Sequence, residues 1–298
     1  MFIRRLPKFE YHAPSTIAEA LDQIAHYGDK AKVFAGGTDI LVTMKKREVV
    51  PEHLINLKGV GEMRGITYDK AVGLKIGALT SIGDIERSEI VGEKFRTLRD
   101  AVKVMAAPQV RNLGTIGGNL CSAVPSADTA PPLIALGASL KLTGADQERV
   151  VAVEDFFTAP GECVLRRDEI LTEILIPNPS ENSGGAYIKL MRRNAMDLAL
   201  VGVGAFLRLD ENKKTCKEAR IALGAVAPTP MRAPRAEAVL KDKEVDENLA
   251  LEAGKIASEE ARPISDIRAS QEYRTEMVRV LTKRAIMTAC HRIAEKGN

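Results

Sequence analysis

The chain has 298 residues, of which 45% are apolar and 28% charged, values of ordinary globular domains that allow two of them. Its net charge of +3 comes from 43 basic and 40 acidic residues without a long basic run, which argues against a nucleic-acid partner. No stretch has the apolar core of a signal peptide or the length of a membrane span. The 4 cysteines are scattered without a CxxC pair, so they predict reduced thiols in the cytoplasm.

The first half of the chain mixes helices with short strands and predicts an α+β fold. A helix capped by Ser15 or Thr16 is expected to carry Ile17, Leu21, Ile24 and Ala25 on one face, and to end at Gly28. Further strands are expected at residues 32–35, 54–57, 74–78, 139–142, 150–153 and 170–176, further helices at residues 40–46, 82–91, 95–106 and 130–136, and a glycine-rich turn at residues 114–119.

Residues 177–185 predict a linker, because they are dense in turn formers and have almost nothing to bury. After them, strands are expected at residues 186–191, 200–209 and 219–226, and helices at residues 235–240, 247–260 and 271–295. The pattern therefore predicts a first domain at residues 1–177, with subdomains of about 1–57 and 58–177, and a second at residues 185–298, a small sheet covered by helices.

Two segments place paired glycines beside small polar side chains. They read Ala-Gly-Gly-Thr-Asp at residues 35–39 and Thr-Ile-Gly-Gly-Asn at residues 115–119. Glycine admits positive φ and lets the backbone approach a ligand without a Cβ in the way. Consecutive backbone N–H groups can then point into one concavity that binds anions, and a helix starting at Ile40 would add its dipole. Because a pyrophosphate carries two phosphates, two facing turns predict a dinucleotide site.

Other sites receive less support from the sequence. A single Gly-Gly pair is more commonly a plain turn, so the prediction of a dinucleotide site depends on the presence of two such segments. A P-loop is excluded because its motif is absent, and residues 59–65 miss the GxGxxG spacing of a Rossmann site by one residue. Without paired carboxylates, a nucleophile elbow or a metal-ligand cluster, we predict no catalytic residue and no metal site in this chain.

At the two glycine segments the sequence resembles the FAD-binding medium subunits of the xanthine dehydrogenase and carbon monoxide dehydrogenase family of molybdenum hydroxylases. Residues 33–41 resemble the family's first FAD loop, and residues 110–119 its second. Further matching positions are Asp128, residues 132–138 and 187–190, Arg193 and Asp197. The resemblance covers nearly the whole chain. It implies a two-part FAD-binding domain of the PCMH/vanillyl-alcohol-oxidase type, followed by a CO dehydrogenase flavoprotein-like C-terminal domain.

The resemblance implies a role for each residue around FAD. The first loop would hold the pyrophosphate and the adjoining ribose through Val33, Phe34, Ala35, Gly36, Gly37, Thr38, Asp39 and Ile40. The second would hold the other side through Thr115, Ile116, Gly117, Gly118 and Asn119. Asp128 would accept a hydrogen bond from an FAD hydroxyl or amine. Met105 and Ala106 would lie near the adenine, and Leu171 would line the site through its backbone.

Two residues are expected near the flavin ring. Lys189 would approach the pyrimidine edge, where positive charge stabilises the reduced flavin, and Tyr187 would pack near the ring. The alternatives are a solvated surface lysine and an ordinary strand aromatic. The 4 histidines lie outside the glycine loops, which predicts a non-covalent FAD and histidines that serve packing. Related 4-hydroxybenzoyl-CoA reductase subunits carry an inserted cysteine-bearing loop; the second loop runs on to Val150 without one, so no iron–sulfur cluster is predicted here.

The family implies an electron-transfer role within a larger assembly. A large partner subunit would hold the molybdenum cofactor and oxidise the substrate, and a small partner would hold two [2Fe–2S] clusters. FAD would take their electrons and pass them to NAD⁺ or another acceptor, and the assembly would be a cytoplasmic dimer of heterotrimers. Two alternatives stay open: a free-standing FAD-dependent reductase or dehydrogenase of the same fold, with its own acid near flavin N5, and a non-redox FAD-holding structural subunit.

Overall fold

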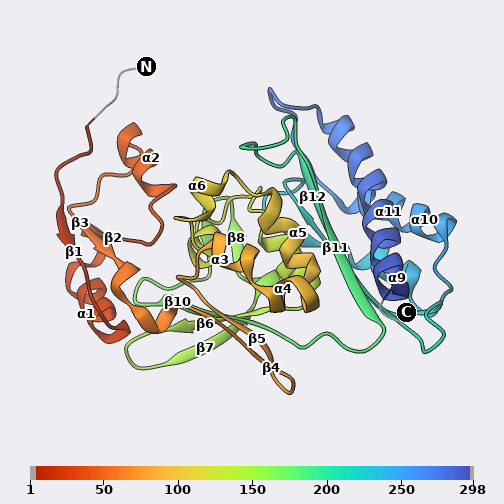
Figure 1. Cartoon of the computed structure of the whole chain (residues 1–298). Helices are drawn as coiled ribbons and strands as arrows, with labels where there is room; N and C mark the ends of the chain where they lie inside the picture. Colours follow the sequence, from red (N-terminus) through yellow and green to blue (C-terminus); the bar gives the residue numbers. More distant parts are fainter. Residues whose placement is uncertain (1–4, 296–298) are drawn as a thin grey trace.

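The computed structural model describes residues 5–295, and Figure 1 shows three successive parts, each a sheet with helices. The first contains β1 (Glu10–His12), α1 (Ile17–Tyr27), β2 (Ala31–Phe34), α2 (Ile40–Lys46) and β3 (His53–Asn56), with 3-10 turns at Gly28–Lys30, Leu57–Gly59 and Gly61–Met63. Its strands form a parallel sheet in the order β1-β3-β2.

The first helix follows the sequence prediction except on its buried face. The Thr16 side chain caps α1 by accepting a hydrogen bond from the N–H of Glu19, and Gly28 ends the helix with a φ of 51°. Leu21 and Ile24 of the expected face are buried together with Ala20, whereas Ala25 is exposed.

The second part carries most of the short helices. Its elements are β4 (Ile66–Asp69), β5 (Gly73–Gly77), α3 (Ile82–Arg87), α4 (Glu89–Lys94), α5 (Arg96–Val104), α6 (Pro108–Arg111), α7 (Ile116–Cys121), α8 (Ala130–Ala135), β6 (Ser139–Thr143), β7 (Glu148–Ala152), a 3-10 turn (Val153–Asp155), β8 (Phe157–Ala159), β9 (Glu162–Cys163) and β10 (Ile170–Ile176). Five strands form an antiparallel sheet in the order β4-β5-β10-β6-β7, and β8 pairs with β9 alone. The helix expected at residues 82–91 is split at Ser88, which ends α3 and caps α4.

The third part is a four-stranded antiparallel sheet with three helices. Its elements are β11 (Ser183–Leu190), β12 (Val201–Leu209), β13 (Cys216–Gly224), β14 (Met231–Arg232), α9 (Pro234–Leu240), α10 (Glu247–Glu260) and α11 (Gln271–Glu295). The linker expected at residues 177–185 is shorter than predicted, because β11 already begins at Ser183. Gly184 and Gly185 serve close packing instead of a turn: a Cβ at Gly185 would lie 2.5 Å from the carbonyl oxygen of Ala205.

The third sheet lies between two layers of helices. Of the C-terminal helices, α11 and α9 contact its outer face and α10 packs against both of them, while α5 and α8 of the second part contact the other face (Figure 1). Arg292 of α11 joins the second and third parts, donating to Asp100 of α5 at 2.6 Å and to the carbonyl oxygen of Gly185 at 2.8 Å.

The first two parts share one hydrophobic core and the third has its own. The domain limits at 177 and 185 stay predictions, and residues 1–4 and 296–298 lie outside the described residues.

A buried arginine fixes the start of α11. The Arg274 guanidinium donates to the carbonyl oxygen of Leu200 at 2.7 Å and to Asp266 at 2.9 Å. Hydrogen bonds from Arg268, with those of backbone N–H groups and Arg274, hold the pKa of Asp266 well below its usual range.

No helix within residues 5–295 combines the length and the apolarity needed to cross a membrane.

Candidate cofactor site

A cavity of about 820 Å³ lies where residues of all three parts meet. Cofactor sites typically measure roughly 300–1,000 Å³, so this volume suits a large ligand. The cavity is lined by most of the predicted site residues, namely Val33, Phe34, Ala35, Gly36, Gly37, Thr38, Asp39, Ile40, Met105, Ala106, Thr115, Gly117, Gly118, Asn119, Asp128 and Leu171. The other three do not line it: Ile116 is buried in the core, and Tyr187 and Lys189 lie behind Asp128.

The first glycine segment connects β2 to α2 and supplies free backbone donors. Gly37 has a φ of 75°, a conformation that glycine adopts without strain. Among the described residues, no acceptor is found for the N–H groups of residues 36–39. These residues are only partly buried or exposed, and all of them line the cavity. The segment is therefore an open set of donors that an anion can satisfy.

The second glycine segment has a different structure from the one predicted. Residues 116–119 begin α7 instead of forming a turn, and Thr115 caps the helix by accepting from the N–H of Gly118 at 3.0 Å. The N–H of Gly117 donates to the carbonyl oxygen of Ala78 at 2.9 Å, and that of Ile116 to Thr80. The expected set of free N–H groups is therefore wrong here, because neighbouring backbone and the helix itself already accept these protons.

The second segment still offers a side-chain hydrogen-bond donor to the cavity, at Asn119. The amide oxygen of Asn119 accepts from the hydroxyl of Thr129 at 2.6 Å, so its NH₂ group is left to face the cavity. Gly117 is required for packing, since a Cβ there would lie 2.7 Å from the Cβ of Ala78.

The first segment contacts residues that flank the second on both sides. A Cβ on Gly36 would lie 2.4 Å from the carbonyl oxygen of Leu113 and 2.8 Å from the Cα of Gly114. The hydroxyl of Ser122 in the turn after α7 donates to Asp39 at 2.8 Å. The first and second segments thus form adjoining walls of one cavity, as the sequence analysis requires of a dinucleotide site.

Asp128 links the cavity to the third sheet. Its carboxylate accepts from the Lys189 ammonium at 2.8 Å and from the Tyr187 hydroxyl at 3.0 Å, and the Lys189 side chain is only 1% exposed. Burial raises the pKa of Asp128, while the Lys189 charge and both hydrogen bonds oppose that rise. Burial and the neighbouring carboxylate raise the pKa of Tyr187 well above its usual value. Neither a solvated lysine nor an ordinary strand aromatic describes these two residues.

The connection between β11 and β12 closes one side of the cavity. Met196 and Asp197 line it, whereas Arg193 does not. Met196 has a φ of 53° and its N–H donates to Ala106, which has a φ of 47°. Non-glycine residues in the left-handed region concentrate at ligand sites. Met196 was not among the predicted site residues, because nothing in the local sequence pattern indicates such a backbone.

The cysteines are all free thiols, as predicted. Cys121 lines the cavity, and burial, followed by the nearby Cys163, raises its pKa to about 12. It therefore stays protonated and unreactive near neutral pH.

Comparisons with known proteins identify the family to which this chain belongs. Residues 7–179 match the model of the FAD binding domain in molybdopterin dehydrogenase, and residues 186–289 that of the CO dehydrogenase flavoprotein C-terminal domain. A similar relative is the carbon monoxide dehydrogenase medium chain of Hydrogenophaga pseudoflava, 36% identical over 97% of this chain and 99% of the relative. A putative xanthine dehydrogenase FAD-binding subunit of Escherichia coli is 33% identical over 94% and 95%.

Solved structures of related enzymes have the same fold as this chain. A carbon monoxide dehydrogenase structure from Hydrogenophaga pseudoflava superposes with a TM-score of 0.93 over 97% of this chain and 99% of that one, at 36% identity. Quinoline 2-oxidoreductase from Pseudomonas putida 86 gives 0.90 at 30% identity, with 97% and 99% covered. The α+β fold predicted from the sequence is confirmed. The chain is an oxidoreductase subunit whose cofactor is FAD, and it belongs to the FAD-binding medium subunits of the molybdenum hydroxylases of the carbon monoxide and xanthine dehydrogenase type.

Proposed function

We propose that this chain is the electron-transfer subunit of a heteromeric molybdenum hydroxylase and holds its FAD without a covalent bond. It takes electrons from [2Fe–2S] clusters of a small partner subunit and passes them to NAD⁺ or another acceptor. The molybdenum cofactor belongs to a large partner, and the assembly is a dimer of heterotrimers in the cytoplasm, a compartment that free thiols suit. The observation that carries the proposal is the row of unpaired N–H groups at residues 36–39 in a cavity of cofactor size.

The residues fit a flavin dinucleotide with unequal contributions from the two segments. The free N–H groups of the first segment bind the diphosphate oxygens. Asn119 adds its NH₂ group from the second segment. Asp128 accepts a hydrogen bond from an FAD hydroxyl or amine while Lys189 keeps its charge balanced. In this arrangement Lys189 acts on the flavin through Asp128, since its ammonium group is enclosed behind that carboxylate.

The lining side chains favour electron transfer over chemistry on a substrate of this chain's own. Bound FAD supplies a carrier that accepts electrons singly and releases them as a pair. Every carboxylate that lines the cavity within residues 5–295 already has a partner: Asp29, Asp39, Asp128, Glu169 and Asp197. Each of these carboxylates is thus held by a hydrogen-bond donor of the protein, whereas a free-standing reductase of this fold would need an acid that donates a proton near flavin N5.

Non-covalent binding has separate support. None of the four histidines, His12, His26, His53 and His291, lines the cavity. Cys121 does line it, but burial holds its thiol protonated, and the thiolate is the nucleophilic form. Acid precipitation of the protein should therefore release FAD completely into the supernatant.

The experiment is anaerobic reduction of the natural complex. The chain is purified with its co-purifying subunits, molybdenum and iron are measured, and the flavin absorbance is followed as candidate substrates and then NAD⁺ are added. We expect substrate to bleach the flavin only when the partners are present, and the acceptor to restore its colour. Bleaching of the isolated chain by a substrate would establish the free-standing enzyme instead, and a flavin that no substrate bleaches in the complex would refute electron transfer.

A further inference from the structure

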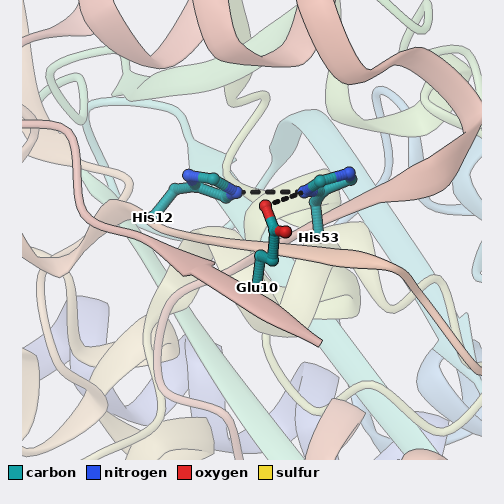
Figure 2. A group of neighbouring side chains, drawn as sticks. All are labelled: Glu10, His12 and His53. Carbon is teal, nitrogen blue, oxygen red and sulfur yellow. Dashed lines mark hydrogen bonds and ion pairs between the residues drawn. The ribbon is translucent and has the colours of Figure 1, made fainter. Parts of the chain in front are cut away.

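Two histidines and a glutamate that do not line the cavity meet on the N-terminal sheet. Within residues 5–295 they are the one group of three such side chains whose ligand atoms all lie within 4.8 Å of one another. His12 Nε2 is 3.1 Å from His53 Nδ1, and His53 Nδ1 is 3.4 Å from a Glu10 carboxylate oxygen. Figure 2 shows the two imidazole rings facing each other with the carboxylate directed toward the gap between them.

Strand pairing creates this group, and sequence spacing conceals it. Glu10 and His12 are two residues apart in β1, so their side chains point to the same face of the sheet. The parallel register places Glu10 beside His53 of β3, a residue 41 positions from His12. Such spacing matches no metal-binding motif, which explains why the sequence analysis predicts no metal site and treats the histidines as packing residues.

Tyr27 at the end of α1 holds both imidazoles in place. Its ring stacks on His53 with centroids 4.0 Å apart and on His12 at 4.5 Å. His53 is largely enclosed, with 14% of its side chain exposed, whereas Glu10 is 74% exposed. The two nitrogen ligands are thus preorganised, and the carboxylate can adjust from the solvent side.

We propose that Glu10, His12 and His53 form a binding site for a divalent transition-metal ion of the zinc class. Zinc binds imidazole nitrogen and carboxylate oxygen at about 2.0–2.2 Å, which separates tetrahedral ligand atoms by about 3.3–3.5 Å. The observed 3.1 Å and 3.4 Å lie close to this separation, and the third distance, between His12 and Glu10, is within 4.8 Å. Water from the exposed side completes the coordination. The ion ties β1 to β3 and so braces the sheet whose third strand, β2, leads into the first glycine segment.

The group does not belong to the cofactor site. None of its three members lines the cavity, so a metal there stabilises the fold and takes no part in electron transfer. Metal binding to the folded protein alone must raise its unfolding temperature, because it draws the equilibrium toward the folded state.

The test uses the full-length FAD-loaded protein, free of any affinity tag and treated with a chelator. Zn²⁺ is titrated by calorimetry, and thermal unfolding is recorded with and without it. We expect one site per chain and a higher unfolding temperature with Zn²⁺. His12→Ala should weaken binding by about 100-fold or more, since losing even an outer partner of a metal ligand costs about 10–100-fold.

Two further variants make the result decisive. Glu10→Gln changes an exposed side chain that folding does not need and should weaken Zn²⁺ binding about tenfold. His291→Ala removes an exposed histidine on α11 and serves as the matched control, with unchanged binding. Absence of a stoichiometric site, or equal affinity in His12→Ala and the parent protein, would overturn the proposal.

Discussion

Gly36→Ala tests whether the two glycine segments close around FAD. The new Cβ would lie 2.4 Å from the carbonyl oxygen of Leu113 and 2.8 Å from the Cα of Gly114. Both are backbone atoms, so neither can rotate away as the end of a flexible side chain would. The first segment must therefore move away from the second, and the free N–H donors move with it.

The size of the effect follows from the overlap. Forcing one extra carbon into a well-packed contact costs about 1–3 kcal/mol. The free protein can relieve the overlap by opening the partly buried segment, whereas bound FAD requires it closed, so most of the cost falls on binding. Since about 1.4 kcal/mol is a factor of ten, FAD affinity should fall about 5- to 150-fold.

The assay is FAD titration of the deflavinated protein, followed by the quenching of flavin fluorescence. Gly61→Ala is the matched control: no atom lies within 4 Å of its added Cβ and its φ is not in the left-handed region. It should bind FAD like the parent protein. If Gly36→Ala also binds like the parent, with an unchanged melting temperature, the segments do not close around the diphosphate.

Three other predictions concern polar side chains, two at the cofactor site and one at the start of α11. Lys189→Met strands the buried Asp128 carboxylate and should cost about 3–5 kcal/mol in urea unfolding, most of it regained with Asp128→Asn added; a cost below about 1 kcal/mol would contradict a buried pair. Asn119→Asp keeps the oxygen that accepts its hydrogen bond but replaces the NH₂ donor by a charge, so FAD affinity should drop at least about tenfold with little change in melting temperature; unchanged affinity would remove this residue from the site. Hydrogen bonds led by those from Arg268 lower the pKa of Asp266, so its stabilisation is present above the unfolded carboxyl pKa of about 3.9 and is lost as pH falls toward the folded value. Asp266→Asn should flatten the fall in melting temperature between about pH 5 and pH 2, and an unaltered pH profile would refute this linkage.

The local sequence pattern predicted where helices begin and end better than it predicted which distant residues contact one another. The helix at residues 40–46 and the Gly28 terminus follow from periodicity and capping, which depend on neighbours in sequence. The glycine-rich turn at residues 114–119 was predicted wrongly because its N–H groups bond to Ala78 and Thr80, more than thirty positions earlier. The pairing of Asp128 with Lys189, 61 positions away, is equally invisible in a local window. In both cases a hydrogen bond between residues far apart in sequence determines the local structure, and a local sequence pattern does not contain that information.

The two glycine segments look alike in sequence and differ in physical role. In the first, backbone donors are free and glycine is needed so that they can reach an anion. In the second, the donors are satisfied internally and glycine is needed so that α7 can approach β5 and the turn after it. Glycine substitutions in the second segment must therefore act on FAD through displaced packing, whereas those in the first displace the free donors themselves. A search for phosphate sites by paired glycines alone cannot separate these roles, whereas counting unpaired N–H groups in the folded chain does.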